Sequence, residues 1–284
     1  MTRVADVIND EKYRPVLDHG FVGLLDVMGS DVDIDKAARC SYGQGTRSVS
    51  DMRGLIRYLV RHLHTSPLEM VELKFHLKMP IFVMRQHVRH RTASLNEYSG
   101  RYSEMTDEFY VPELDRFQGQ SKDNKQASGA ELDQSVAKVM QHKMNTEFEN
   151  NYELYQTLLE GGLARELARG VLPVNNYTEL YWKIDLKNFL HYIKLRLHSH
   201  AQYEIRVFAE AMWELVKPLI PITAEAFEDY WLNSNTMSAM EMELLKKVLG
   251  DLGVTMIDCD PSQFKLTKKE LNELNEKLGF AFRV

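Results

Sequence analysis

Apolar residues recur at helical spacing over residues 51–64, where the sequence reads DMRGLIRYLVRHLH. This spacing predicts an amphipathic helix, which Ser50 or Asp51 can cap at its start. The segment HTSP ends the helix, because Pro67 disfavours helical geometry at the residue before it. A second face of the predicted helix carries three basic residues, Arg53, Arg57 and Arg61.

Apolar and polar residues alternate strictly over residues 71–79, VELKFHLKM. The alternation predicts a half-buried strand in an antiparallel sheet. Pro80 suits the first turn of a following helix, which would run from about Ile81 to Arg91. The segment 177–184, YTELYWKI, predicts a second strand. The solvent face of the first strand is expected to carry Glu72, Lys74, His76 and Lys78.

Residues 92–129 read mostly as loop, and two helical segments follow them. The first, 131–160, predicts a long helix that Gly161 and Gly162 stop. The second, 163–171, predicts a short helix that ends before a proline.

A further helical pattern begins after the second predicted strand. Asp185 can cap a helix that runs past Arg196, and the helical pattern continues through about Val216. Strands and helices in this order predict an α+β fold, an antiparallel sheet with helices packed around it.

The chain changes character from about Ala224, where it becomes a polar, helical tail. Thr267 and Glu270 have the spacing of a capping box for a last helix. We therefore expect a catalytic domain over residues 1–223 and a helical C-terminal extension over residues 224–284.

Composition narrows the classes of protein that the chain can be. Its hydrophobic content of 44% and charged content of 27% are ordinary for a soluble globular protein. No apolar run approaches the roughly 20 residues of a membrane helix, and the first residues lack the apolar segment of a secretory signal. The two cysteines, Cys40 and Cys259, form no CxxC pair, which argues against a disulfide scaffold or a structural zinc site. We expect a cytoplasmic protein with no metal.

Positive charge is concentrated in residues 85–102, RQHVRHRTASLNEYSGRY, although the whole chain has a formal net charge of -6. So many cations close together repel one another unless an anion neutralises them. Arginine pairs well with phosphate, and Arg85 and Arg89 lie one helical turn apart, so both can point into one pocket. Gly100 allows close backbone approach. This segment predicts a site for a small phosphorylated ligand.

Three other interpretations of the basic segment compete with that site. It could be a solvated face with salt bridges to Glu97 and Glu104. It could belong to a nucleic-acid-binding module, which the acidic net charge disfavours. It could also serve a cofactor-free nucleotide-modifying enzyme, in which Ser99 is a nucleophile and His87 or His90 its base.

A more specific pattern lies inside this segment: Arg89-His90-Arg91, seven residues, then Ser99. With this signature, the chain resembles the flavin-dependent thymidylate synthases. The longer pattern RHRxxSxNExSxRY is also met, by Ser94, Asn96, Glu97, Arg101 and Tyr102. Other similar segments, in order over roughly residues 18 to 216, are DHGFVGLLDVMG, AARCSY, HTSPLE, PIFVMRQ, RELARGVLP and LRLHSHAQYEI.

The resemblance implies an activity and an assembly. Members of this family methylate dUMP to dTMP with FAD, taking the one-carbon unit from 5,10-methylenetetrahydrofolate and the reducing equivalents from NADPH. They are homotetramers with shared active sites, built on an antiparallel sheet with helices. By resemblance, the chain's partners are therefore dUMP, a folate and its own copies, with no nucleic acid and no membrane.

The resemblance also implies site residues at matching positions. The positions that match cofactor-binding residues are Ser66, Glu69, Arg89, His90, Arg91, Glu97, Asp185, Lys187 and His191. The positions that match substrate-binding residues are Gln86, His87, Arg89, Glu97, Tyr98, Ser99, Gly100, Arg101, Arg169 and Arg196.

Three of the matching positions are expected to act in catalysis. Arg196 matches an arginine placed against the pyrimidine, where positive charge stabilises negative charge on the ring. His64 matches a histidine close to the flavin and the folate, and Ser99 is expected to hydrogen bond dUMP. A cysteine thiolate is a known way to activate a pyrimidine, but Cys40 and Cys259 lie outside the motif. Activation by reduced flavin and Arg196 fits this sequence better.

Overall fold

The computed structural model describes residues 1–40, 51–121, 128–253, 256–258, 266–278 and 281–283. Ser50 and Cys259 lie outside the described residues. A five-stranded antiparallel sheet forms the centre of the molecule, which confirms the antiparallel sheet surrounded by helices. Its strands, in spatial order, are β1 (Tyr13–Val16), β2 (Gly20–Met28), β3 (Glu72–Pro80), β7 (Tyr177–Asp185) and β4 (Ser94–Glu97).

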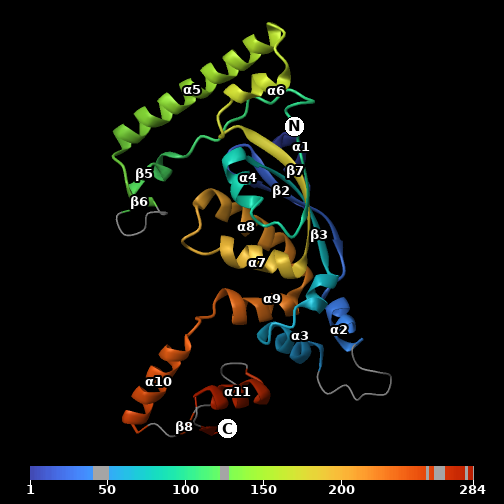
Figure 1. Cartoon of the computed structure of the whole chain (residues 1–284), viewed down its shortest axis with the longest axis vertical. Helices are drawn as coiled ribbons and strands as arrows, with labels where there is room; N and C mark the ends of the chain where they lie inside the picture. Colours follow the sequence, from blue (N-terminus) through green and yellow to red (C-terminus); the bar gives the residue numbers. More distant parts are fainter. Residues whose placement is uncertain (41–50, 122–127, 254–255, 259–265, 279–280, 284) are drawn as a thin grey trace.

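Helices surround this sheet in three groups (Figure 1). One face is covered by α4 (Ile81–His87), α7 (Leu186–Arg196) and α8 (Tyr203–Val216). One end carries α2 (Asp31–Arg39), α3 (Met52–Arg61), the 3-10 turn η1 (Ser66–Met70) and α9 (Pro221–Phe227). The opposite end carries α5 (Gln134–Glu160), α6 (Arg165–Ala168) and the 3-10 turn η3 (Arg169–Val171).

Shorter elements complete the described part of the chain. Two small two-stranded sheets pair β5 with β6 and β8 with β9. The remaining helices, turns and strands are α1 (Val4–Val7), η2 (Leu114–Arg116), β5 (Gln118–Gln120), β6 (Ser128–Glu131), η4 (Lys217–Leu219), the π-helix η5 (Glu228–Leu232), α10 (Ala239–Asp251), β8 (Met256–Asp258), α11 (Lys268–Leu278) and β9 (Ala281–Arg283).

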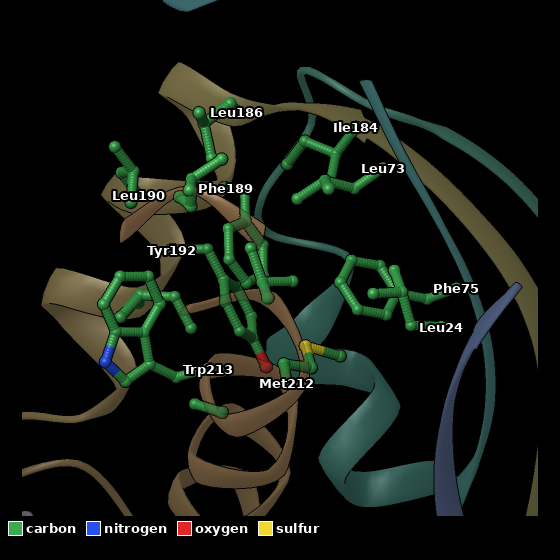
Figure 2. Close-up of a cluster of buried hydrophobic side chains, with 14 of the residues drawn as sticks. Leu24, Leu73, Phe75, Ile184, Leu186, Phe189, Leu190, Tyr192, Met212 and Trp213 are labelled. Carbon is green, nitrogen blue, oxygen red and sulfur yellow. The ribbon is translucent and has the colours of Figure 1, made fainter. Parts of the chain in front are cut away.

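The hydrophobic core lies between the sheet and the helices α7 and α8. Phe75 of β3 stacks on Phe189 of α7 with ring centroids 5.5 Å apart, and Trp182 of β7 packs beside them. Figure 2 shows the side chains of α7, among them Phe189 and Tyr192, pointing between α8 and the sheet. Burial of these large rings stabilises the fold by roughly 1.5–3 kcal/mol each. The core therefore fixes α7, whose last residue is Arg196, against the sheet.

Several elements form where the sequence predicts them. Asp51 caps α3 by accepting a hydrogen bond from the Gly54 backbone at 2.8 Å. Asp185 caps α7 in the same way, at 2.9 Å from the Asn188 backbone. The long helix α5 ends at Glu160, before the two predicted glycines, and the capping box that opens α11 is present.

The expectation that β3 has one solvent-facing side is wrong for its second half. His76 and Lys78 are buried, because distant residues cover that face. The His76 ring lies between the Tyr13 hydroxyl, at 3.0 Å, and the Glu179 carboxylate, at 2.6 Å. The Lys78 ammonium donates to Glu108 at 2.8 Å. Alternation along one strand cannot reveal partners supplied by other segments.

The ends of other predicted elements also need correction. The helix predicted to continue from Asp185 through Val216 is two helices, since the chain leaves helical geometry between α7 and α8. The helix predicted to reach Arg91 ends at His87, and Pro80 belongs to β3. The predicted loop 92–129 contains β4, an exposed strand whose polar sequence gives no apolar alternation, and the sequence prediction did not include β1 or β2.

The boundary predicted at residues 223 and 224 falls inside α9. Ala224, Ala226 and Phe227, on the far side of that boundary, are buried in the main core. Asp31 of α2 accepts hydrogen bonds from the backbones of Ile222 and Thr223, and so joins α2 to the first turn of α9. The division into a catalytic domain and an extension stays a prediction.

None of the helices in the described ranges is both long enough and apolar enough to cross a membrane.

Candidate active site

A cavity of about 290 Å³ lies where the RHR segment meets α7. The segment has left helical geometry after His87, so Arg89, His90 and Arg91 lie on an irregular stretch between α4 and β4. The side of α7 that faces this stretch contributes the opposite wall. The cavity is lined by Arg89, His90, Arg91, Thr92, Ile184, Asn188, His191, Leu195 and Arg196.

Arg196 and His90 are held together inside this cavity. The Arg196 Nε donates to His90 Nε2 at 3.0 Å, and its Nη2 donates to the Gln86 carbonyl at 3.3 Å. A guanidinium has no lone pair to give, so His90 Nε2 must be the acceptor and its ring proton must sit on Nδ1. Arg196 lies at the C-terminus of α7, where the helix dipole favours positive charge.

Burial, together with Arg196 and His191, lowers the pKa of His90 to about 4. Burial, with His90 and Arg196, likewise lowers the pKa of His87 to about 3. Both rings are therefore neutral at pH 7. A neutral His90 adds no further positive charge to a cavity that already has three arginines, and it can accept the Arg196 hydrogen bond.

The two arginines of the RHR motif have no acidic partner in the described parts of the chain. Arg89 and Arg91 are exposed, and neither guanidinium forms an ion pair or a hydrogen bond there. Arg196 is bonded to neutral groups alone, a histidine and a backbone carbonyl. Three unneutralised cations around one cavity create a strongly positive potential, as a site for a phosphorylated ligand requires.

The structure does not support the solvated face with salt bridges to Glu97 and Glu104. The Glu97 carboxylate accepts from the Thr178 hydroxyl at 2.7 Å. Glu104 pairs with Arg165 at 3.4 Å instead.

A second group of the predicted substrate residues gathers around Gly100. An added Cβ at Gly100 would lie 2.9 Å from the Met105 sulfur and 3.2 Å from the Arg169 Cδ, so a larger residue would displace the Met105 side chain and crowd that of Arg169. The Ser99 hydroxyl accepts from the Arg101 backbone at 3.3 Å, and Arg101 forms a partly exposed ion pair with Glu166 at 3.4 Å. Glycine therefore lets the backbone approach Arg169 closely.

Just before this group in the chain, Glu97 ends strand β4 and Tyr98 follows it. The Tyr98 hydroxyl donates to the Glu104 carbonyl at 2.6 Å, and its backbone N–H donates to the Glu179 carbonyl at 2.7 Å. The bonds of Tyr98 fix the chain as it leaves the sheet and so set the direction in which Ser99 begins the next turn.

A third group lies at the beginning of α7. The turn η1, which starts at Ser66 and contains Glu69, leads directly into β3, whose first residue Glu72 pairs with Asp185. Lys187 follows within the first turn of α7, so these predicted cofactor residues are brought together. They lie on the order of 16 Å from Arg196, the length of the eleven residues of α7 at the usual helical rise.

Two predictions about histidines and serine are changed by this geometry. His87 is 0% exposed, and its ring packs against Trp182 and Tyr192, with centroids 4.3 and 5.2 Å away. This burial favours a role for His87 beneath the site over direct contact with the substrate, and its predicted substrate contact stays a prediction. Ser99 hydrogen bonds no histidine in the described ranges, so the nucleophile hypothesis lacks the base it needs.

Several residues of the site were not predicted, among them Thr92, Ile184 and Leu195 of the cavity lining. Tyr192 is buried between His87 and His90, Thr178 holds Glu97, and Asn188 lines the cavity. Asn188, His191 and Leu195 are spaced three and four residues apart, so a helical plot from His191 could have found Asn188. Thr178 and Tyr192 offered no such signal, because one lies on a strand and the other reads as an ordinary core residue.

The chain is similar in sequence to proteins of one family. The family model described as thymidylate synthase complementing protein matches residues 23–222. A flavin-dependent thymidylate synthase from Ehrlichia ruminantium (strain Gardel) is 48% identical over 268 residues, 94% of this chain and 89% of that protein. One from Thermus thermophilus is 53% identical over 236 residues, 83% of this chain and 85% of that protein.

Solved structures with the same fold bind pyrimidine nucleotides. A UMP/dUMP methylase from Streptomyces cacaoi, bound with 5-Br dUMP, superposes with a TM-score of 0.69 at 36% sequence identity. The superposition covers 77% of this chain and 98% of that one. The same methylase bound with 5-Br UMP gives a TM-score of 0.68 at 37% identity, over 76% of this chain and 96% of that one.

Proposed function

The chain belongs to the family of flavin-dependent thymidylate synthases, and we propose that it methylates dUMP to dTMP with FAD as its flavin. We propose 5,10-methylenetetrahydrofolate as the carbon donor and NADPH as the reductant. The observation that carries this proposal is the positive cavity around Arg89, Arg91 and Arg196, whose cations lack acidic partners in the described ranges. Such a cavity is suited to nucleotide phosphates and to negative charge on a pyrimidine ring.

The donors around the cavity fit a flavin nucleotide. Arg89 and Arg91 offer exposed guanidinium groups for a diphosphate, while Asn188 and His191 offer neutral polar groups from one face of α7. Ser66 and Glu69 of η1, with Asp185 and Lys187, lie at the other end of the same helix, as the separated parts of a dinucleotide would need. When bound, the flavin would supply the hydride-transfer chemistry.

Arg196 is the residue that we expect to activate the pyrimidine. Its guanidinium is fixed by His90 and the Gln86 carbonyl, so its orientation is set before a substrate arrives. Placed against dUMP, it would stabilise negative charge on the ring and so favour the nucleophilic character of C5. Neither bond neutralises its charge, because the histidine is neutral and the carbonyl is uncharged.

We propose that the substrate site is completed by another copy of the chain in a homotetramer. Residues expected to bind dUMP fall into two groups, one with Arg196 and one with Gly100 and Arg169. Figure 1 shows α6 beside α5 at one end of the molecule, away from α7, and η3, which begins with Arg169, follows α6 directly and contacts α5. We propose that a nucleotide contacts both groups at once because they come from different subunits, and we expect this assembly in the cytoplasm.

A spectroscopic titration tests the proposal. The purified protein is expected to show flavin absorption bands that bleach anaerobically with NADPH, faster when dUMP is present. With dUMP and 5,10-methylenetetrahydrofolate added, dTMP should form in amounts equal to the NADPH consumed. A colourless protein that stays colourless after incubation with FAD would overturn the flavin proposal. Flavin bands without any dTMP would overturn the proposed reaction.

A further inference from the structure

The C-terminal helix α11 lies outside the part of the chain that the family model matches, yet it packs against α3. Glu270 accepts from the Arg57 Nε at 2.8 Å and from the Arg61 Nη1 at 3.1 Å. Glu273, one turn further along α11, pairs with Arg61 at 2.7 Å. These bonds join the last described helix to the helix that leads into His64.

This junction is buried, unlike most surface ion pairs. The side chains of Arg57 and Glu270 are each 4% exposed, and Tyr230 of η5 bonds both. Exposed ion pairs contribute little, whereas a buried charge left without its partner is strongly unfavourable. These buried pairs therefore hold α11 firmly on α3.

Two residues of α11 extend the contact toward His64. The Lys269 ammonium lies over the Tyr58 ring, 3.9 Å from its centroid. Tyr58 in turn contacts His64 edge-on, with ring centroids 5.6 Å apart. Glu273 accepts from His62 at 3.2 Å, and the His62 ring lies 4.4 Å from the Tyr58 ring.

The backbone between the two histidines ends α3 in a Schellman motif, in which the residue after the C-cap takes a left-handed conformation. Leu63 has a positive φ of 58°, a conformation that a leucine rarely adopts and that costs on the order of 1–3 kcal/mol. Such a residue persists where surrounding contacts fix the chain on both sides. Here the His64 backbone donates to the Leu59 carbonyl at 2.9 Å and the Leu63 backbone to the Val60 carbonyl at 3.3 Å. The helix end thus fixes the backbone of His64, and Tyr58, on which Lys269 lies, contacts its ring.

We propose that α11 positions His64 for the reaction, through Lys269 on Tyr58 and Glu273 on His62. The proposal rests on the proposed function, in which His64 lies close to the flavin and the folate. Lys269 and Glu273 are thus positioning residues, since they touch Tyr58 and His62 rather than a ligand. The C-terminal segment would then be part of the working site, although it lies far from the RHR motif in sequence.

The experiment compares two variants of the full-length chain, Lys269→Ala and Glu273→Gln, with two matched controls on the exposed side of α11, Lys277→Ala and Glu276→Gln. Each control makes the same change of charge on the same helix. For both test variants we expect kcat for dTMP formation to fall about 10- to 100-fold, the effect of a misplaced reacting group. The KM for dUMP should stay within twofold of wild type, because its expected contacts lie elsewhere.

Two further readouts separate positioning from simple loss of structure. The visible absorption band of the bound flavin should shift in Lys269→Ala and Glu273→Gln and not in the controls. Lys269→Arg, which keeps a cation over Tyr58, should restore both kcat and the band. If the two test variants match their controls in kcat and in the flavin band, the proposal is overturned. A wild-type protein with no flavin and no dTMP formation overturns the proposed function instead.

Discussion

Arg196 donates a hydrogen bond from its Nε to Nε2 of His90 across 3.0 Å, so one basic side chain at the cavity is the donor and its basic neighbour is the acceptor. The bond fixes the guanidinium and requires a neutral His90. We predict that Arg196→Ala lowers kcat/KM for dTMP formation by about 10²- to 10³-fold, as loss of one preorganised electrostatic contact typically does. The measurement is steady-state dTMP formation, with Lys194→Ala, an exposed cation on the same helix, as control.

The same variant should change the titration of His90. Burial is the main cause of its low pKa of about 4, and Arg196 is the next. Removing Arg196 should therefore raise the pKa of His90 part of the way toward its ordinary value near 6.5. Histidine NMR titration of Arg196→Ala against wild type checks this; an unchanged His90 pKa would show that the contact has no electrostatic role.

His87 should prove to act beneath the site. Both of its ring nitrogens are buried without a partner in the described ranges, and so is the nearby Tyr192 hydroxyl. An unpaired buried polar group costs on the order of 1–3 kcal/mol, and an apolar ring can replace it at little loss. We predict that His87→Phe keeps the thermal midpoint and the KM for dUMP near wild type. A tenfold rise in KM with an unchanged midpoint would instead support direct contact with substrate.

The cysteines offer a test of how the pyrimidine is activated. Cys40 is exposed at the end of α2, and its backbone bonds the last turn of that helix. Figure 1 shows α2 at the opposite end of the sheet from α6, the helix that leads directly into Arg169. If activation depends on reduced flavin and Arg196, the double variant Cys40→Ser, Cys259→Ser should form dTMP at close to the wild-type rate. Loss of more than 100-fold, with the flavin retained, would point to a thiolate nucleophile.

The sequence predicts a residue's surroundings well only when its interaction partners lie close to it along the chain. Arg89 and Arg91 lie on an exposed local segment, so a count of charges was enough to predict an anion site there. Arg57 reads as one of three cations on a helix face, yet it is buried. Its partners Glu225, Asp229 and Glu270 are 168, 172 and 213 residues away along the chain, beyond any local pattern.

The strands show the same dependence. Strand β7 is rich in aromatic and β-branched residues and was predicted within a residue of its ends. Strand β4, SLNE, is exposed throughout and pairs with β7 at the edge of the sheet, so nothing in its own sequence marks it. Cross-strand pairing, which is a tertiary property, decides such a segment.

Acid should weaken the attachment of α11 through Glu270. Although burial alone would raise its pKa, hydrogen bonds from Tyr230, the Thr267 backbone and Arg57 lower the pKa of Glu270 to about 2. A folded-state pKa below the unfolded value of about 4.5 stabilises the fold above pH 4.5, and this contribution is lost as pH falls from 4.5 toward 2. At pH 7 this contribution to the free energy of unfolding is about 3 kcal/mol.

The measurement for Glu270 is urea unfolding of wild type and Glu270→Gln at pH 7 and at pH 3. The variant should be less stable than wild type at pH 7. The difference between their free energies of unfolding should be smaller at pH 3, where the wild-type carboxylate contributes less stability. Glu276→Gln, on the exposed face of α11, should differ little from wild type at either pH. A gap that does not change with pH would mean that the charge of Glu270 is not what stabilises the contact.

The boundary of the catalytic domain can be tested by truncation within the C-terminal region. A chain that ends at residue 223 loses Ala224, Ala226 and Phe227, which are buried in the main core. It also cuts α9 just after the backbone groups that bond the buried Asp31 carboxylate. Removing one large core side chain costs about 3–5 kcal/mol, a large part of the stability of an ordinary domain. We therefore predict that residues 1–223 alone fail to fold.

A chain that ends at residue 235 is the matched comparison for that truncation. It keeps α9 and η5, so the core remains whole and Arg57 still pairs with Glu225 and Asp229. We expect it to unfold cooperatively in a circular dichroism melt and to bind flavin, with reduced dTMP formation because α11 is absent. If residues 1–223 melt cooperatively at the wild-type temperature, the core does not need α9 and the predicted boundary at 223 is a true domain limit.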